Sequence, residues 1–187
     1  MTTIVTHALV PLAVGLGLGP KLVPPRLLLV GCLAAMLPDA DVVAFRFGIV
    51  YSDILGHRGL SHSLLFAAIV GLFATCTCRF LKSRTLPTFL FVTGAVASHI
   101  ALDMVTNGGL GVALLWPWSE ERFFAPWRPV EVSPFLRRFF SERGLTVLLS
   151  ELRWVWLPML AASLTLRGIR VRASKTKIAR SRDSALL

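Results

Sequence analysis

The chain has 187 residues, of which 55% are apolar and 16% are charged, and its mean hydropathy is +0.69. This composition is too apolar for an ordinary soluble domain, so it predicts an integral membrane protein. The net charge of +10 does not indicate a nucleic-acid partner, because seven of the basic residues follow Leu166. The positive-inside rule and anionic lipid account better for basic residues in that place.

Five apolar segments predict an all-α polytopic membrane helix bundle in which some spans are short. They are Ile4 to Gly19, Leu27 to Leu37, Ser63 to Phe80, Pro87 to Val105, and Gly144 to Leu166. Residues 42–56 read as a mixed loop. The stretch from 111 to 143 contains tryptophans, prolines and charges of both signs, which is typical of a loop at the membrane–water interface. We expect residues 1–170 to form one membrane-embedded domain and residues 171–187 to form a basic, flexible cytoplasmic tail.

Gly15, Gly17 and Gly19 in the first segment have the spacing of a nucleotide-binding loop, but no strand precedes them. We interpret them as small residues that let two membrane helices approach closely. The prediction is therefore a packing role rather than a nucleotide site.

The distribution of basic residues predicts the orientation of the chain in the membrane. With the tail inside, twelve lysines and arginines lie inside and seven lie outside, and the N-terminus is outside. This topology brings the polar residues of the apolar segments to one level near the outer face. They are His7, Asp39, Asp41, His57, His62, His99, Asp103 and Glu151.

The spacing of these residues is typical of metal ligands. His99 and Asp103 are four residues apart, so on a helix they share one face about 6 Å apart along the axis. The turn Pro38-Asp39-Ala40-Asp41 supplies two carboxylates, one of which could bridge two ions. His57 and His62 precede an apolar segment, on a turn that enters a helix. Histidine and carboxylate ligands together suit zinc, with manganese or iron as substitutes.

We therefore predict a site for one or two ions with the ligands His7, Asp39, Asp41, His57, His62, His99 and Asp103. Each member taken alone has an ordinary alternative. A lone His-x-x-x-Asp pair is often only hydrogen-bonded, His7 suits the membrane interface, and Asp39 suits the cap of a turn. The joint placement at one level favours the metal site, because isolated polar residues are costly in a membrane.

Three motifs resemble the LexA-regulated, membrane-bound metal-dependent hydrolases known as YdjM-like proteins. They are Pro38-Asp39-Ala40-Asp41, His57-Arg58-Gly59-Leu60-Ser61-His62-Ser63, and Ser98-His99 with Asp103, Thr106-Asn107-Gly108-Gly109 and Leu115-Trp116-Pro117-Trp118-Ser119. More distantly, the order of histidines and aspartates is similar to zinc-dependent phospholipase C and P1-type nucleases. That likeness implies His7, Asp39 or Asp41, His57 or His62, His99 and Asp103 as ligands. Residues before His7 and the lack of a second helical His–acid pair depart from the pattern.

The leading hypothesis is a zinc-dependent hydrolase that cleaves a phosphoester of a lipid at the outer face of a bacterial inner membrane. Asp39 or Asp41 would accept a proton from water, Arg58 would bind phosphate, and Glu151 would complete the site. Ser61 and Ser63 are expected as helix caps, and Arg122 and Arg128 as headgroup contacts.

Three other functions stay open. They are a ceramidase-like amide hydrolase of lipids, a metal or proton carrier, and a non-enzymatic assembly factor. A carrier needs polar residues at both ends of its path, whereas the inner halves of the apolar segments are apolar, which favours an enzyme. The sequence gives no oligomeric state.

Overall fold

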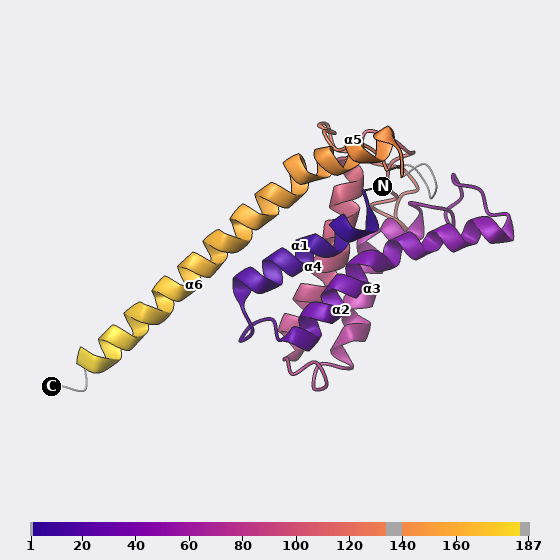
Figure 1. Cartoon of the computed structure of the whole chain (residues 1–187). Coiled ribbons are helices and arrows are strands. Elements are labelled where there is room, and N and C mark those ends of the chain that lie inside the picture. Colours follow the sequence, from indigo (N-terminus) through magenta and orange to yellow (C-terminus); the bar gives the residue numbers. More distant parts are fainter. Residues whose placement is uncertain (1, 134–139, 184–187) are drawn as a thin grey trace.

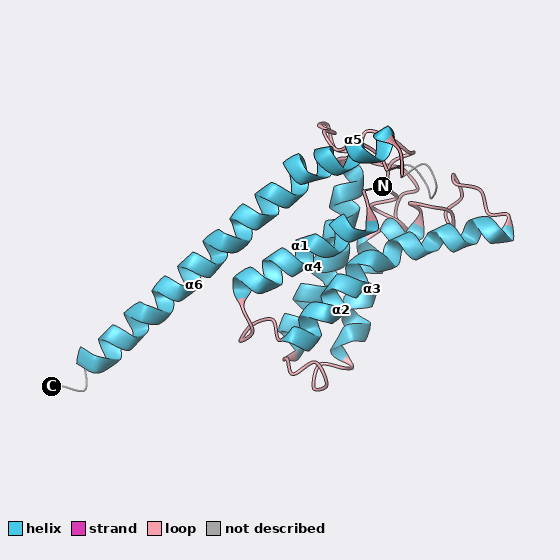
Figure 2. Cartoon of the chain, in the orientation of Figure 1, coloured by secondary structure: helices cyan, strands magenta, loops and turns pink. Residues whose placement is uncertain are grey.

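The computed structural model describes residues 2–133 and 140–183, with side chains described in 2–133 and 140–176. The predicted all-α bundle is confirmed, and the described residues form no strand beyond two isolated bridges, Thr106–Val130 and Val112–Phe123 (Figures 1 and 2). The helical elements are α1 (Ile4–Leu18), α2 (Pro25–Met36), η1 (Leu37–Phe47), η2 (Leu60–His62), α3 (Leu64–Thr75), α4 (Thr85–Met104), α5 (Glu142–Glu151), η4 (Leu152–Trp156) and α6 (Leu157–Asp183).

Three helical segments among the described residues are long and apolar enough to cross a membrane. They comprise residues 25–47, 85–104 and 142–176, whereas α1 and α3 are shorter apolar helices. The combination of long and short apolar helices agrees with the predicted bundle. The loop between α4 and α5 lies at the same end of the bundle as η1 and η2 (Figure 1).

Two boundaries differ from the sequence prediction. Residues 42–47 continue a 3₁₀ helix rather than starting a loop. Pro38 has no N–H, so the α-helical ladder of α2 cannot run through it, and the chain tightens into 3₁₀ turns instead. α3 ends at Thr75, before the predicted Phe80, where Thr75 and Thr77 donate to the carbonyls of Leu72 and Ala74. Such local bonds compete with helix propagation.

The glycines of α1 allow close helix packing, as predicted. A Cβ at Gly15 would lie 2.5 Å from Leu28 on α2, and one at Gly17 would lie 2.9 Å from the Cβ of Leu166 on α6. Both distances are too short for a side chain. α1 therefore lies directly against α2 and α6, which fixes the position of its first turn at the polar end of the bundle.

The basic segment after residue 170 is helical rather than an irregular tail. α6 continues to Asp183 and runs beyond the bundle toward the C-terminus (Figure 1). Its alanines, arginines and lysines are good helix formers, so no tertiary contact is needed to explain the helix. The predicted flexibility and cytoplasmic location of residues 171–187 stay predictions, and residues 184–187 lie outside the described residues.

Candidate metal centre

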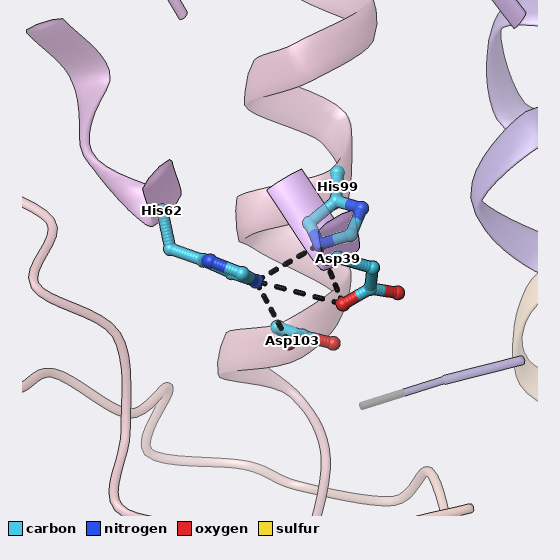
Figure 3. A group of neighbouring side chains, drawn as sticks. All are labelled: Asp39, His62, His99 and Asp103. Carbon is cyan, nitrogen blue, oxygen red and sulfur yellow. Dashed lines mark hydrogen bonds and ion pairs between the residues drawn. The ribbon is translucent and has the colours of Figure 1, made fainter. Parts of the chain in front are cut away.

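Four polar side chains meet inside the bundle (Figure 3). Asp39 lies in η1, His62 ends η2, and His99 and Asp103 lie about one turn apart on α4. His62, His99 and Asp103 are fully buried, and Asp39 is 5% exposed. Burying so many polar groups is costly unless each has a partner, so the partners of these atoms determine what the cluster can do.

Hydrogen bonds at the Nδ1 atoms of His62 and His99 fix the direction in which their Nε2 atoms point. The Nδ1 of His99 lies 2.7 Å from the carbonyl of Ala35, which can only accept, so this nitrogen is the donor. The Nδ1 of His62 lies 3.2 Å from the Asp41 carboxylate and donates in the same way. In the neutral rings both Nε2 atoms are then acceptors, and they face each other 3.0 Å apart.

The carboxylates of Asp39 and Asp103 add oxygen acceptors to the same space. Neither oxygen of Asp39 has a hydrogen-bond partner among the described residues. Asp39 Oδ1 lies 3.8 Å from His62 Nε2 and 3.6 Å from His99 Nε2, and Asp103 Oδ2 lies 3.5 Å from His62 Nε2. Although Asp103 Oδ2 also pairs with Arg58, this concentration of acceptors in a buried space favours a positive charge between them.

The donor set and its spacing fit zinc. The four candidate ligand atoms lie within 4.8 Å of one another, and four of their separations run from 3.0 to 3.8 Å. A tetrahedral zinc ion with bonds of about 2.0–2.2 Å separates its ligand atoms by about 3.3–3.5 Å. Two imidazole nitrogens and two carboxylate oxygens also belong to the ligand types that zinc prefers.

Asp41 has a different environment, although it lies only two residues from Asp39. Its carboxylate accepts from His57 Nδ1 and Ser61 Oγ at 2.6 Å, from the Arg58 N–H at 3.1 Å, and from His62 Nδ1. Asp41, His57 and His62 form a second group that could hold an ion. The 2.6 Å between Asp41 and His57 is a hydrogen-bond distance, however, and is short for two ligands of one zinc ion. Asp41 therefore orients His62.

Arg58 is fully buried and lies inside the protein. Its Nε lies 2.9 Å from Asp103 Oδ2 in an ion pair, and its other nitrogens donate to the Thr106 hydroxyl and the Gly108 carbonyl. Its guanidinium is therefore occupied by protein groups. In this structure Arg58 neutralises and orients Asp103, and the prediction that it binds phosphate stays a prediction.

His7 lies beside the four-residue group but on its other side. Its ring stacks on His99 with centroids 3.6 Å apart, and its Nε2 is 2.8 Å from the Thr2 hydroxyl. The same nitrogen is 3.7 Å from Asp39 Oδ2 and from Asp103 Oδ1, which are not the oxygens nearest His62. Asp39 and Asp103 thus each have one carboxylate oxygen near His62 and the other near His7.

Glu151 is buried at the end of α5, where it binds the N-terminal turn of the chain. It accepts from the Thr3 N–H, from the Thr3 hydroxyl at 2.6 Å and from the Thr6 hydroxyl at 2.7 Å. Glu151 is thus linked to the cluster through Thr3 and Thr6, which flank His7. The prediction that Glu151 completes the site stays a prediction.

Several supporting groups could not be recognised in the sequence. The Thr2 N–H donates to Asp103 Oδ1, Trp156 donates to the Thr6 hydroxyl, and the Ala35 carbonyl accepts from His99. Backbone groups give no sequence signal, and threonines in an apolar helix usually bond to their own backbone. Of the expected caps, Ser63 caps α3 by accepting from Phe66 N–H, whereas Ser61 binds Asp41 instead.

The loops around the cluster hold the two arginines expected as headgroup contacts, and those contacts stay predictions. Arg122 donates to the carbonyls of Ser52, Asp53 and His57, so it braces the loop before η2. Arg128 is exposed and stacks on Phe124 at 4.6 Å.

His62 lies outside the membrane-spanning segments, and its pKa shows what charge the cluster favours. Burial alone lowers the pKa of the imidazole, but the carboxylates of Asp103 and Asp41 outweigh burial and raise the pKa above its ordinary value. The cluster therefore stabilises positive charge at the position of His62.

Comparison with known proteins identifies relatives but no solved template. The family model of the YdjM inner membrane protein matches residues 1–175. The inner membrane protein YbcI of Escherichia coli strain K12 is 52% identical over 160 residues, which cover 84% of this chain and 92% of that protein. No solved structure matches the chain.

Proposed function

Because the chain belongs to the YdjM family of inner membrane proteins, we propose that it is a membrane-bound, zinc-dependent hydrolase of lipid phosphoesters. One observation supports this most: two histidine nitrogens and two carboxylates converge in a buried space that favours a cation. A divalent ion there supplies Lewis acidity and an activated water, which is the chemistry that phosphoester hydrolysis needs. Manganese or iron are possible substitutes for zinc.

The two aspartates of the η1 turn take different roles in this proposal. Asp39 has no donor on either oxygen, so one oxygen can bind the ion while the other can accept a proton from water. Asp41 already accepts four donors and cannot serve as the base. It holds His62 with Nε2 toward the ion, an arrangement that commonly tunes metal-binding histidines. Arg58 performs a similar task for Asp103.

A second ion would lie on the His7 side of the cluster. His7 Nε2 faces Asp39 Oδ2 and Asp103 Oδ1 at 3.7 Å each, while the other oxygens of both carboxylates face His62. Both aspartates can therefore bridge two ions, which we propose as the fully loaded state. Two ions there would stabilise both the attacking and the leaving oxygen of a phosphoester displacement.

Substrate entry requires a movement of the N-terminal turn. Thr2 is fully buried and contacts both His7 and Asp103, and Thr3 is tied to Glu151. We propose that residues 2–6 cover the site at rest and that Glu151 sets how readily they open. The positive-inside rule places this end at the periplasmic face, so a lipid of the outer leaflet is the proposed substrate. The control by LexA that the sequence resemblance implies stays a prediction.

The test is metal content followed by headgroup release. We expect the purified protein to contain one or two equivalents of zinc by elemental analysis, and to release a phosphorylated headgroup from total membrane lipid. Asp39→Asn should abolish release, whereas Glu131→Gln, at an exposed ion pair far along the sequence, should not. Zinc-loaded protein that releases no headgroup from any lipid would contradict the hydrolase but not the metal site.

The closed geometry favours a second candidate, a structural metal site in a non-enzymatic assembly factor. Structural zinc sites have four protein ligands, whereas catalytic sites leave a position for water. Here four buried protein groups are available. This candidate predicts that chelation lowers the melting temperature, that no lipid is cleaved, and that zinc stays four-coordinate with protein ligands only by X-ray absorption spectroscopy.

A further inference from the structure

Two neighbouring cavities lie along α4 on the apolar surface of the bundle. The first, of about 480 Å³, lies between α1 and α4, and the second, of about 310 Å³, lies between α4 and the start of α6. Val10 and Ser98 line both cavities, so the two adjoin each other and together make one groove. We call this the α4 groove. It extends from Leu22 and Pro87 at one end to Trp127 and Trp154 at the other.

The wall of the α4 groove is apolar along its length. Apart from the two tryptophans, Ser98 is the one polar side chain among the described residues that line the cavities, and its hydroxyl donates to the carbonyl of Ala95 within α4. A ligand in the groove therefore meets no free polar side chain until it reaches the tryptophan end. The volumes are within the usual range of small-ligand sites, which is too little for an additional helix about 10 Å in diameter.

The tryptophan end has the chemistry of a membrane interface with a positive charge. Trp127 and Trp154 pack edge to face with ring centroids 4.9 Å apart, and the guanidinium of Arg153 lies 4.8 Å from the centre of the Trp154 ring. Tryptophan rings rest at the level of lipid headgroups. An exposed arginine at that level attracts an anionic phosphate through its planar group of donors.

We propose that the α4 groove binds one acyl chain of an anionic phospholipid, with the lipid phosphate beside Arg153. None of the four candidate metal ligands lines either cavity, so this lipid site is separate from the metal centre. Ser98 and Leu102 line the groove, while His99 and Asp103 on the same helix are buried in the cluster. The proposal does not depend on the hydrolase function.

Gly94 allows the groove to be filled without disturbing the fold. It lines the first cavity, and a Cβ added there would have no neighbour within 4 Å. Gly168 on α6 is equally open but lines neither cavity, so Gly168→Leu is the matched control. Both substitutions replace a helical glycine with a good helix former, so neither should lower the melting temperature.

The experiment measures binding of phosphatidylglycerol and phosphatidylcholine to the purified full-length protein by native mass spectrometry. We expect Gly94→Leu to weaken phosphatidylglycerol binding about tenfold, since the leucine displaces roughly two methylene groups of the chain. Gly168→Leu should bind like the wild type, and all three proteins should keep the same zinc content. Arg153→Gln should remove the preference for phosphatidylglycerol over phosphatidylcholine.

A second experiment, lipid photo-crosslinking, uses the wild-type protein. Phosphatidylglycerol with a photoreactive group in its acyl chain should crosslink to Leu90 and Leu102, which line the two cavities. Unchanged binding in Gly94→Leu, crosslinks confined to other helices, or a dimer that Gly94→Leu dissociates would each overturn the proposal. The last outcome would identify a second copy of the chain as the occupant.

Discussion

Asp39 and Asp41 lie two residues apart on the same turn, yet they have opposite environments. Asp41 accepts from four donors, whereas Asp39 has no donor on either oxygen and faces the nitrogens of His62 and His99 instead. A carboxylate with donors is stable by itself, and one that faces only acceptors needs a cation. Asp39 is therefore the aspartate suited to bind an ion, whereas Asp41 is the one that orients the histidine ligand.

The largest effect is expected from Asp39→Asn. Removing this charge should lower zinc affinity at least a hundredfold, because a direct ligand is lost. In the absence of metal the variant should be more stable than the wild type, since the amide can donate to an Nε2 that has no donor. Elemental analysis and melting curves with and without chelator measure both effects. A metal-free variant less stable than the metal-free wild type would contradict the idea that Asp39 lacks a partner.

Asp41→Asn should have the opposite effect on the metal-free protein. The loss of a charged acceptor leaves donors of His57, His62 and Arg58 poorly satisfied, so we expect about 2–3 kcal/mol of destabilisation with or without metal. Zinc affinity should fall roughly ten- to a hundredfold, as is usual for groups that orient a metal-binding histidine. Chemical denaturation and competition with a chelator measure the two numbers. Equal metal loss in Asp39→Asn and Asp41→Asn would remove the distinction between the aspartates.

Glu151→Gln tests the N-terminal turn, whose residues lie beside the candidate metal ligands. The amide keeps one acceptor but places a donor against the N–H and hydroxyl groups of Thr3 and Thr6, so the turn should loosen. We expect about a tenfold loss of zinc affinity together with faster hydrogen exchange in residues 2–6. Thr146→Val, at an exposed hydroxyl of the same helix, is the control. Unchanged exchange in residues 2–6 would show that Glu151 does not hold the turn.

The sequence predicted which residues belong to the cluster. It could not tell which of them are suited to bind an ion directly and which only orient the others. The four-residue spacing of His99 and Asp103 placed both on one helix face, and the topology brought the other acids and histidines to the same end. The difference between Asp39 and Asp41 depends on how the backbone of residues 57–62 aims its donors, which spacing does not reveal. Arg58 is a similar case: its burial follows from the turn around it, where it adopts φ 65°, and not from its own chemistry.

The smallest effect should come from Glu131, a half-buried surface carboxylate whose charge is already paired. It pairs with Arg143 at 2.7 Å, and a hydrogen bond from Asn107, followed by one from Arg143, holds the pKa of Glu131 below its ordinary value.

A lowered folded-state pKa means that the stabilisation by Glu131 is present above the unfolded-state pKa and disappears as the pH falls through the folded-state pKa. Because both side chains are largely in water, Glu131→Gln should cost no more than about 0.5 kcal/mol at neutral pH. The difference from wild type should shrink below about pH 4, where the unfolded carboxyl becomes protonated, and should vanish only below the lowered folded-state pKa. Denaturation at pH 7 and pH 3.5 measures it. A larger loss, or one that affects zinc content, would mean that the interface loop is coupled to the buried aspartates and that the contrast between exposed and buried carboxylates fails.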